Sequence, residues 1–151
     1  MLRNPIQFHY LVDPFFFPER NRLKDFITRM LKREGKRVEA INYIFCTDRF
    51  LLDLNEKHLK HNTYTDIITF EFSGKHQPLI SDIYISIDRI KDNAISFSTS
   101  FINELHRVIF HGALHLAGYK DKSKIDLILM REMEDKWLKA YRSTWNFTSK
   151  S

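Results

Sequence analysis

The segment from Phe101 to Ala117 constrains the fold of this chain most, because its apolar residues follow the spacing of a helix with a broad buried face. The apolar positions are Ile102, Leu105, Val108, Ile109, Leu114 and Leu116. Gly118 follows the segment and can end a helix in the left-handed conformation. The sequence therefore predicts a long helix that runs through the core and ends just before residue 118.

Two histidines on this helix indicate a metal site. His111 and His115 are four residues apart, so they lie one turn apart on the same helix face. Asp121 follows the turn and can swing back towards both imidazoles. Two rings and a carboxylate can hold a metal ion and leave coordination positions open, which is typical of a catalytic site. A histidine pair at this spacing also arises by chance, and a histidine on an apolar helix face is often a hydrogen-bonded core residue, so the spacing alone leaves both interpretations open.

The residue after the first histidine argues against a peptidase. Zinc peptidases with this histidine spacing place a glutamate there as general base. Gly112 occupies the position here and has no side chain to accept a proton. The pattern predicts a zinc-type hydrolase site that does not follow the peptidase mechanism. Two histidines and a carboxylate also hold ferrous iron for oxygen chemistry, but the jelly-roll strand pattern usual behind such sites is absent.

The composition is typical of a soluble protein, and the charge favours an anionic partner. The chain has 151 residues, of which 43% are hydrophobic, so it is long enough for a substantial core, and we expect one domain over residues 1–151. The net charge of +5 favours nucleic acid, although a solvated cationic helix face is the usual alternative. Cys46 is the single cysteine, which excludes an internal disulfide and a cysteine metal cluster. Without a signal peptide, a membrane span or a heptad seam in the sequence, we expect a cytoplasmic monomer.

The remaining periodicities predict an α+β fold. Strands are expected at residues 6–10, 38–47, 66–72 and 79–87, and helices at 20–34, 48–59, 88–96, 101–117 and 123–141. Strands and helices in this order predict one mixed four-stranded sheet covered by about five helices. The metal site is then expected at the end of the long core helix.

Three blocks of the chain resemble the YbeY family of bacterial metal-dependent endoribonucleases. The segment from His111 to Tyr119, His-Gly-Ala-Leu-His-Leu-Ala-Gly-Tyr, resembles the family signature His-Gly-x-Leu-His-Leu-x-Gly-Tyr-Asp-His. Two further blocks support the resemblance and occur in the family order. The first consists of Leu54-Asn55 and Thr65-Asp66-Ile67-Ile68-Thr69-Phe70, and the second is Asp82-Ile83-Tyr84-Ile85-Ser86. The resemblance implies a zinc-dependent, single-strand-specific endoribonuclease in the maturation of the 3′ end of 16S ribosomal RNA and in ribosome quality control. The implied partners are 16S ribosomal RNA and components of the small ribosomal subunit.

The resemblance also implies the residues of the site. We expect His111, His115 and Asp121 to bind one divalent metal ion, with Zn²⁺ as the first candidate. Asp82 is a candidate for supporting the histidines by a hydrogen bond from behind, and a carboxylate that caps a helix or bonds to a loop is its alternative role. Asp66, just before a strand, is expected to be a turn residue.

The chain departs from the family at a phosphate-binding position. The family's functional arginine aligns with Leu59, whose apolar side chain cannot clamp a phosphate. Lys60 and His61 follow and could supply the phosphate contacts, although lysine lacks the bidentate fork of arginine. This departure supports an alternative function: an assembly factor that binds RNA or a ribosomal protein, with a mainly structural metal site.

A second departure is Asp121, which stands where the family has its third metal-binding histidine. A carboxylate leaves a divalent site one unit less positive than three neutral imidazoles would, so a water molecule on the metal should be less acidic. We therefore expect Asp121→His to move the pH optimum of cleavage to lower pH. Comparing the pH–rate profiles of the two proteins tests this expectation, and identical profiles would refute it.

Overall fold

The structure, a computed structural model, describes residues 4–59 and 65–149. The strands in these residues are β1 (Ile6–Tyr10), β2 (Val38–Cys46), β3 (Ile67–Glu71) and β4 (Leu79–Ser86). The helices are α1 (Arg20–Arg33), α2 (Asp48–Leu54), α3 (Ile87–Ser96), α4 (Phe101–Leu116) and α5 (Lys124–Ser149), with a π-helical turn, η1 (Asn55–Leu59), after α2. The predicted α+β fold and its order of elements are confirmed.

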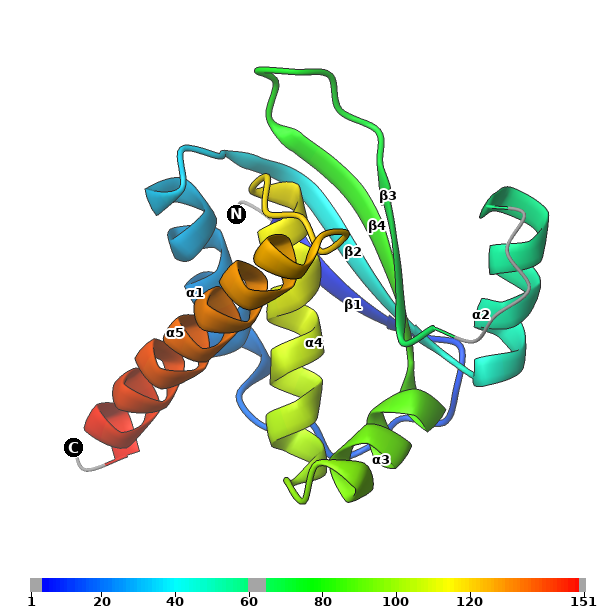
Figure 1. Cartoon of the computed structure of the whole chain (residues 1–151). Coiled ribbons are helices and arrows are strands. Elements are labelled where there is room, and N and C mark those ends of the chain that lie inside the picture. Colours follow the sequence, from blue (N-terminus) through cyan, green and yellow to red (C-terminus); the bar gives the residue numbers. More distant parts are fainter. Residues whose placement is uncertain (1–3, 60–64, 150–151) are drawn as a thin grey trace.

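The strands form one mixed sheet in the order β1-β2-β4-β3. The strand β2 lies between β1 and β4 and is parallel to both, whereas β3 forms an antiparallel edge beside β4. Helices α1, α4 and α5 lie on one side of the sheet and α2 lies on the other (Figure 1). Because β2 is covered on both sides, its last four residues, from Tyr43 to Cys46, are all buried.

Two helices differ from their predicted bounds. The helix expected at 48–59 is regular only to Leu54 and then widens into η1, which begins at the buried polar residue Asn55. Helix α5 was expected to end near Tyr141 but continues to Ser149, because residues 142–149 contain neither glycine nor proline to stop it. In the ranges that the structure describes, no helix combines the length and the apolar character that a membrane crossing requires.

Helix α4 begins and ends as its sequence predicts. The Ser100 side chain accepts a hydrogen bond from the backbone N–H of Asn103 at 3.0 Å and so caps the first turn. At the other end Gly118 has a φ of 110°, and Tyr119 N–H returns to the Leu114 carbonyl at 3.0 Å. The hydroxyl of the buried Tyr43 on β2 donates to the Ile109 carbonyl at 2.9 Å. These contacts fix the position of the histidine helix against the sheet.

At Gly112, helix α4 packs closely against side chains of the sheet. A β-carbon added there would lie 3.0 Å from Ile67 Cδ1 and 3.1 Å from Ile83 Cγ2, closer than ordinary van der Waals contact. Gly112→Val is therefore expected to lower the free energy of unfolding by about 1–3 kcal/mol, and Gly112→Ala by less. Urea denaturation measures both changes. A Gly112→Val protein as stable as the wild type would contradict this packing.

Candidate metal centre

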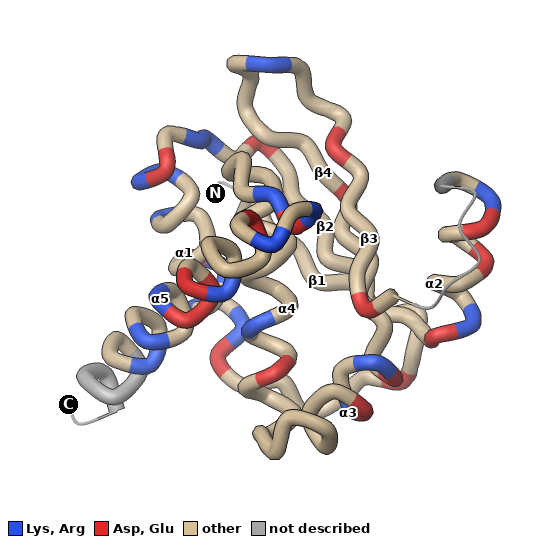
Figure 2. Tube along the Cα trace, in the orientation of Figure 1, with Lys and Arg blue, Asp and Glu red and all other residues tan. Residues whose placement is uncertain are grey.

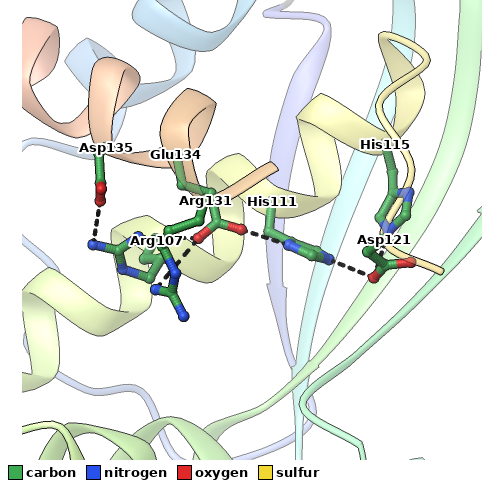
Figure 3. A network of polar contacts seen from close by, with 7 residues as sticks. All are labelled: Arg107, His111, His115, Asp121, Arg131, Glu134 and Asp135. Carbon is green, nitrogen blue, oxygen red and sulfur yellow. Dashed lines mark hydrogen bonds and ion pairs between the residues drawn. The ribbon is translucent and has the colours of Figure 1, made fainter. Parts of the chain in front are cut away.

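The three residues predicted to hold a metal lie together in the structure. His111 and His115 belong to the last two turns of α4, and Asp121 returns towards them after the Gly118 turn (Figure 3). Asp121 Oδ2 is 3.3 Å from His111 Nε2 and 3.1 Å from His115 Nε2. The candidate ligand atoms all lie within 4.8 Å of one another.

This donor set fits a divalent metal ion. With bonds of about 2.0–2.2 Å, two ligand atoms of a tetrahedral ion lie about 3.3–3.6 Å apart. The distance from Asp121 to His111 is in this range, and the distance of 3.1 Å to His115 is slightly shorter. The side chains of His111, His115 and Asp121 are 19%, 29% and 35% exposed, so the centre is open to solvent on one side. Three protein ligands with an open fourth position are typical of catalytic zinc sites.

Glu134 orients the His111 ring by a hydrogen bond to the ring nitrogen that faces away from Asp121. Its Oε2 lies 2.7 Å from His111 Nδ1, and its other oxygen accepts from Arg107 Nη1 at 3.0 Å. A carboxylate on Nδ1 fixes the proton on that nitrogen and leaves the Nε2 lone pair free for a metal. Sequence reasoning missed Glu134, although its spacing to Met130 and Trp137, which are both buried, puts it on the inward face of α5. The available signal in the sequence was a glutamate at a position of the helix where the spacing predicts an apolar residue.

Carboxylates around His111 also change its acidity. Burial lowers the pKa of His111, but the hydrogen bond and charge of Glu134, together with Asp66 and Asp121, more than reverse this and raise the pKa above its ordinary value. A protonated imidazole cannot bind a metal ion. Protons therefore compete with a metal for His111 at a higher pH than they would for an isolated histidine.

Asp66 is a second carboxyl group of the site that sequence reasoning missed. It was expected to be a turn residue, but its backbone carbonyl accepts from Ser86 N–H at 3.0 Å and so extends the pairing of β3 with β4. Together with His111 it also lines the two cavities that meet at the metal centre. Burial raises the pKa of this carboxyl group above its usual value. Asp66 belongs to one of the blocks that resemble the family, which was the signal for a role in the site.

Asp82 does not support the histidines. Its neighbour Ile83 faces Gly112 of α4, and successive side chains of a strand point to opposite faces, so Asp82 faces away from α4. Its carboxylate accepts a hydrogen bond from Asn42 Nδ2 at 3.2 Å, between paired residues of β2 and β4. The supporting role expected as one alternative for Asp82 is filled by Glu134.

The predicted phosphate contacts Lys60 and His61 lie outside the described residues. The backbone of Leu59, the residue aligned with the family arginine, is the last of η1.

The metal centre opens into a groove of about 900 Å³. The groove runs along the edge strand β3, and its polar lining includes Asn55, Thr65, Thr69, Glu71 and Lys122. A second cavity, of about 410 Å³, lies between α3, α4 and α5 and shares Asp66 and His111 with the groove.

The cationic first quarter of the chain does not line this groove. Many of its lysines and arginines lie on α1 and the turn that follows (Figure 2). Helix α1 packs against β1 and β2, whereas the groove follows β3 at the opposite edge of the sheet. A solvated cationic helix face, the usual alternative to nucleic-acid binding, therefore fits these residues better than contact with RNA beside the metal centre.

Comparison with known proteins identifies the family. The family model described as endoribonuclease YbeY matches residues 17–142. The chain is 43% identical to the endoribonuclease YbeY of Flavobacterium psychrophilum, over 93% of this chain and 99% of that protein. It is 42% identical to the endoribonuclease YbeY of Karelsulcia muelleri, over 87% and 88% of the two chains.

A solved structure has the same fold. The solution structure of the Thermotoga maritima protein TM1509 matches with a TM-score of 0.63 and 24% identity, and the match covers 95% of this chain and 93% of that one. The family model and the relatives confirm the resemblance of the three sequence blocks: this chain belongs to the endoribonuclease YbeY family, enzymes that cut RNA chains internally.

Proposed function

We propose that this protein is a metal-dependent endoribonuclease that cuts single-stranded ribosomal RNA. The observation that carries the proposal is the cluster of His111, His115 and Asp121 at the mouth of the groove, in a chain of the YbeY family. The finer parts of the proposal are Zn²⁺ as the metal, the 3′ end of 16S ribosomal RNA as the substrate, and a role in ribosome quality control. It places the protein in the cytoplasm as a monomer, with components of the small ribosomal subunit as partners.

The residues of the site have separate tasks in this proposal. His111, His115 and Asp121 would hold the ion, which when bound supplies a Lewis acid for a phosphoryl oxygen. Glu134 keeps the His111 ring in the orientation and tautomer that ligation requires. Asp66 lies beside His111 and is a carboxyl group that can hold or move a proton at the reacting phosphate.

The polar lining of the groove supports the proposed preference for single strands. Asn55, Thr65 and Thr69 offer donors and acceptors along β3, and unpaired bases present their hydrogen-bonding edges to such groups. In a duplex these edges are occupied by base pairing.

Lys60 and His61 remain our candidates for the phosphate contacts that the family assigns to the arginine aligned with Leu59. We expect Lys60→Ala and His61→Ala to slow cleavage, because each removes a group that can pair with a phosphate. Rate measurements under multiple-turnover conditions test this. If both variants kept full activity, the compensation would lie elsewhere, and Leu59→Arg would be the next variant to measure.

Leu59 also favours a second candidate function, an assembly factor with a structural metal. The two proposals differ in what His111→Ala does. In the enzyme that we propose, the variant stays folded and loses metal and cleavage. In an assembly factor whose metal is structural, the same variant unfolds, and the wild type binds RNA without cutting it.

A nuclease assay with two matched substrates tests the proposed function. Purified protein of known metal content is incubated with a single-stranded ribosomal RNA fragment and with the same fragment annealed to its complement. We expect cleavage of the single strand, little cleavage of the duplex, and loss of cleavage in a folded Asp121→Ala variant. Equal cleavage of both substrates, or an active Asp121→Ala variant, would overturn the proposal.

A further inference from the structure

The cavity between α3, α4 and α5 lies beside the metal centre. We call it the α3–α5 cavity; its walls include Phe97, Val108, Leu127, Met130 and Arg131. It shares Asp66 and His111 with the groove, so the metal centre lies where the two spaces meet. Figure 3 shows Arg107, Arg131 and Glu134 on one side of His111, and Asp121 and His115 on the other.

An exposed aromatic ring lines this cavity. Phe97 follows α3 and is 58% exposed, although a phenylalanine is normally buried. Its backbone is held in place, because Phe97 N–H donates to the Asn93 carbonyl at 2.8 Å and Thr99 N–H donates to the Ala94 carbonyl at 2.9 Å. Leu127 on α5 also lines the cavity and is 53% exposed. The cavity therefore offers an exposed aromatic ring on a hydrogen-bonded backbone to a flat apolar group.

The two arginines of the cavity differ in what they can bind. Arg107 is 18% exposed and is already paired with Glu134 at 3.0 Å and Asp135 at 2.8 Å. Arg131 is 56% exposed, and its described ion pair is a longer contact of 3.7 Å to Glu134. Arg131 thus presents a guanidinium group to solvent, and such a group binds phosphate in a bidentate manner.

The charges of the cavity favour the base of a nucleotide over its phosphate. Asp66, Glu104 and Glu134 contribute carboxyl groups to its lining, and a phosphate placed among them would be repelled. A neutral base would not be repelled, and the exposed Arg131 can take the neighbouring phosphate. At about 410 Å³ the cavity is at the small end of ligand sites and suits one nucleotide better than a protein helix.

We propose that the α3–α5 cavity binds one base of single-stranded RNA next to the phosphodiester at the metal centre. The base stacks on Phe97, and the phosphate on its outer side pairs with Arg131. This inference rests on the proposed endoribonuclease function and adds to it a subsite that sets where the strand is cut. It also supplies a guanidinium group for the phosphate one nucleotide away from the cut, in a chain that has Leu59 in place of the family arginine.

A double comparison of enzyme and substrate tests the subsite. Wild type and Phe97→Ala are assayed on three single-stranded RNAs. One is intact, one has an abasic nucleotide on the 5′ side of the cut, and one has it on the 3′ side. Stacking of one base on an aromatic side chain corresponds to about 5- to 150-fold in kcat/KM. For the wild type, we expect kcat/KM to fall by a factor in this range when the abasic nucleotide is at one of the two flanks. For Phe97→Ala, we expect a lower kcat/KM on the intact strand already, and little further decrease on the abasic strand.

Matched variants separate the subsite from general effects. Phe16→Ala removes a phenylalanine that is 80% exposed and lies outside the described cavities, and it should cut like the wild type. Arg131→Gln should raise KM and lower the salt dependence of RNA binding by about one phosphate contact, whereas Arg33→Gln on α1 should change neither.

Two outcomes would overturn the subsite while the proposed function stands. One is an active wild type in which Phe97→Ala behaves like Phe16→Ala. The other is an abasic penalty of the same size in the wild type and in Phe97→Ala. A folded, metal-loaded wild type without any cleavage would instead overturn the proposed function itself, so the two failures are distinguishable.

Discussion

Replacing His115 with alanine is expected to abolish RNA cleavage in a protein that remains folded. The His115 side chain is 29% exposed, and its described polar contact is the one with Asp121 at 3.1 Å, so its removal should disturb the core little. It takes away one of three ligands of the ion. Metal ions contribute several kcal/mol to phosphoryl chemistry, so the expected loss in kcat/KM is about a thousandfold or more.

A histidine far from the site provides the control. His76 lies in the loop between β3 and β4 with a φ of 66°, a conformation that asparagine tolerates, so His76→Asn should keep both fold and activity. Metal content and circular dichroism are measured beside the cleavage rate. If a folded His115→Ala protein cut RNA at the wild-type rate, the three-residue centre would not be the catalytic site.

Glu134→Gln is expected to weaken metal binding about 10- to 100-fold. It should also lower stability, because the largely buried Arg107 loses a charged partner. Glutamine keeps the shape of the side chain but removes the negative charge 2.7 Å from His111 Nδ1. This charge is part of what raises the pKa of His111, so its loss should make the ring a weaker ligand. The pH below which the metal affinity begins to decrease should also fall, because a histidine of lower pKa is protonated only at lower pH.

Asp135→Asn is a close control for this variant. Asp135 is the next residue along α5 and pairs with the same Arg107, at 2.8 Å, but it has no described contact with His111. Metal affinity is measured by competition with a chelator of known affinity across a pH series. If Glu134→Gln and Asp135→Asn bound metal equally well, Glu134 would serve to pair Arg107 and would not tune His111.

The sequence predicts the helix that carries the site because all the relevant signals are local. The apolar spacing of Phe101–Leu116 and the Gly118 stop lie within a short segment. The same segment includes both histidines, and Asp121 needs only one turn to reach them. Local spacing was therefore sufficient to predict that the three side chains lie together, whereas a metal-binding role for them drew on the family resemblance as well.

The supporting residues depend on packing between elements that are distant in the chain. Glu134 meets His111 only because α5 packs along α4, and nothing in the histidine segment specifies that contact. The position of Asp82 could have been assigned from the alternation along β4, which places it on the face opposite Ile83. Asp66 reaches the centre because β3 pairs with β4 at the edge of the sheet, a strand order that local periodicity does not determine.

The most direct test of the account is to remove and restore the metal of the wild-type protein. The purified chain is stripped with a chelator, its folding is verified, and cleavage of single-stranded ribosomal RNA is followed as Zn²⁺ or another divalent ion is added back. We expect a folded metal-free protein without activity, and recovery that saturates at one metal equivalent per chain. Full cleavage by the metal-free protein, or none by a folded and metal-loaded one, would contradict a metal-dependent endoribonuclease.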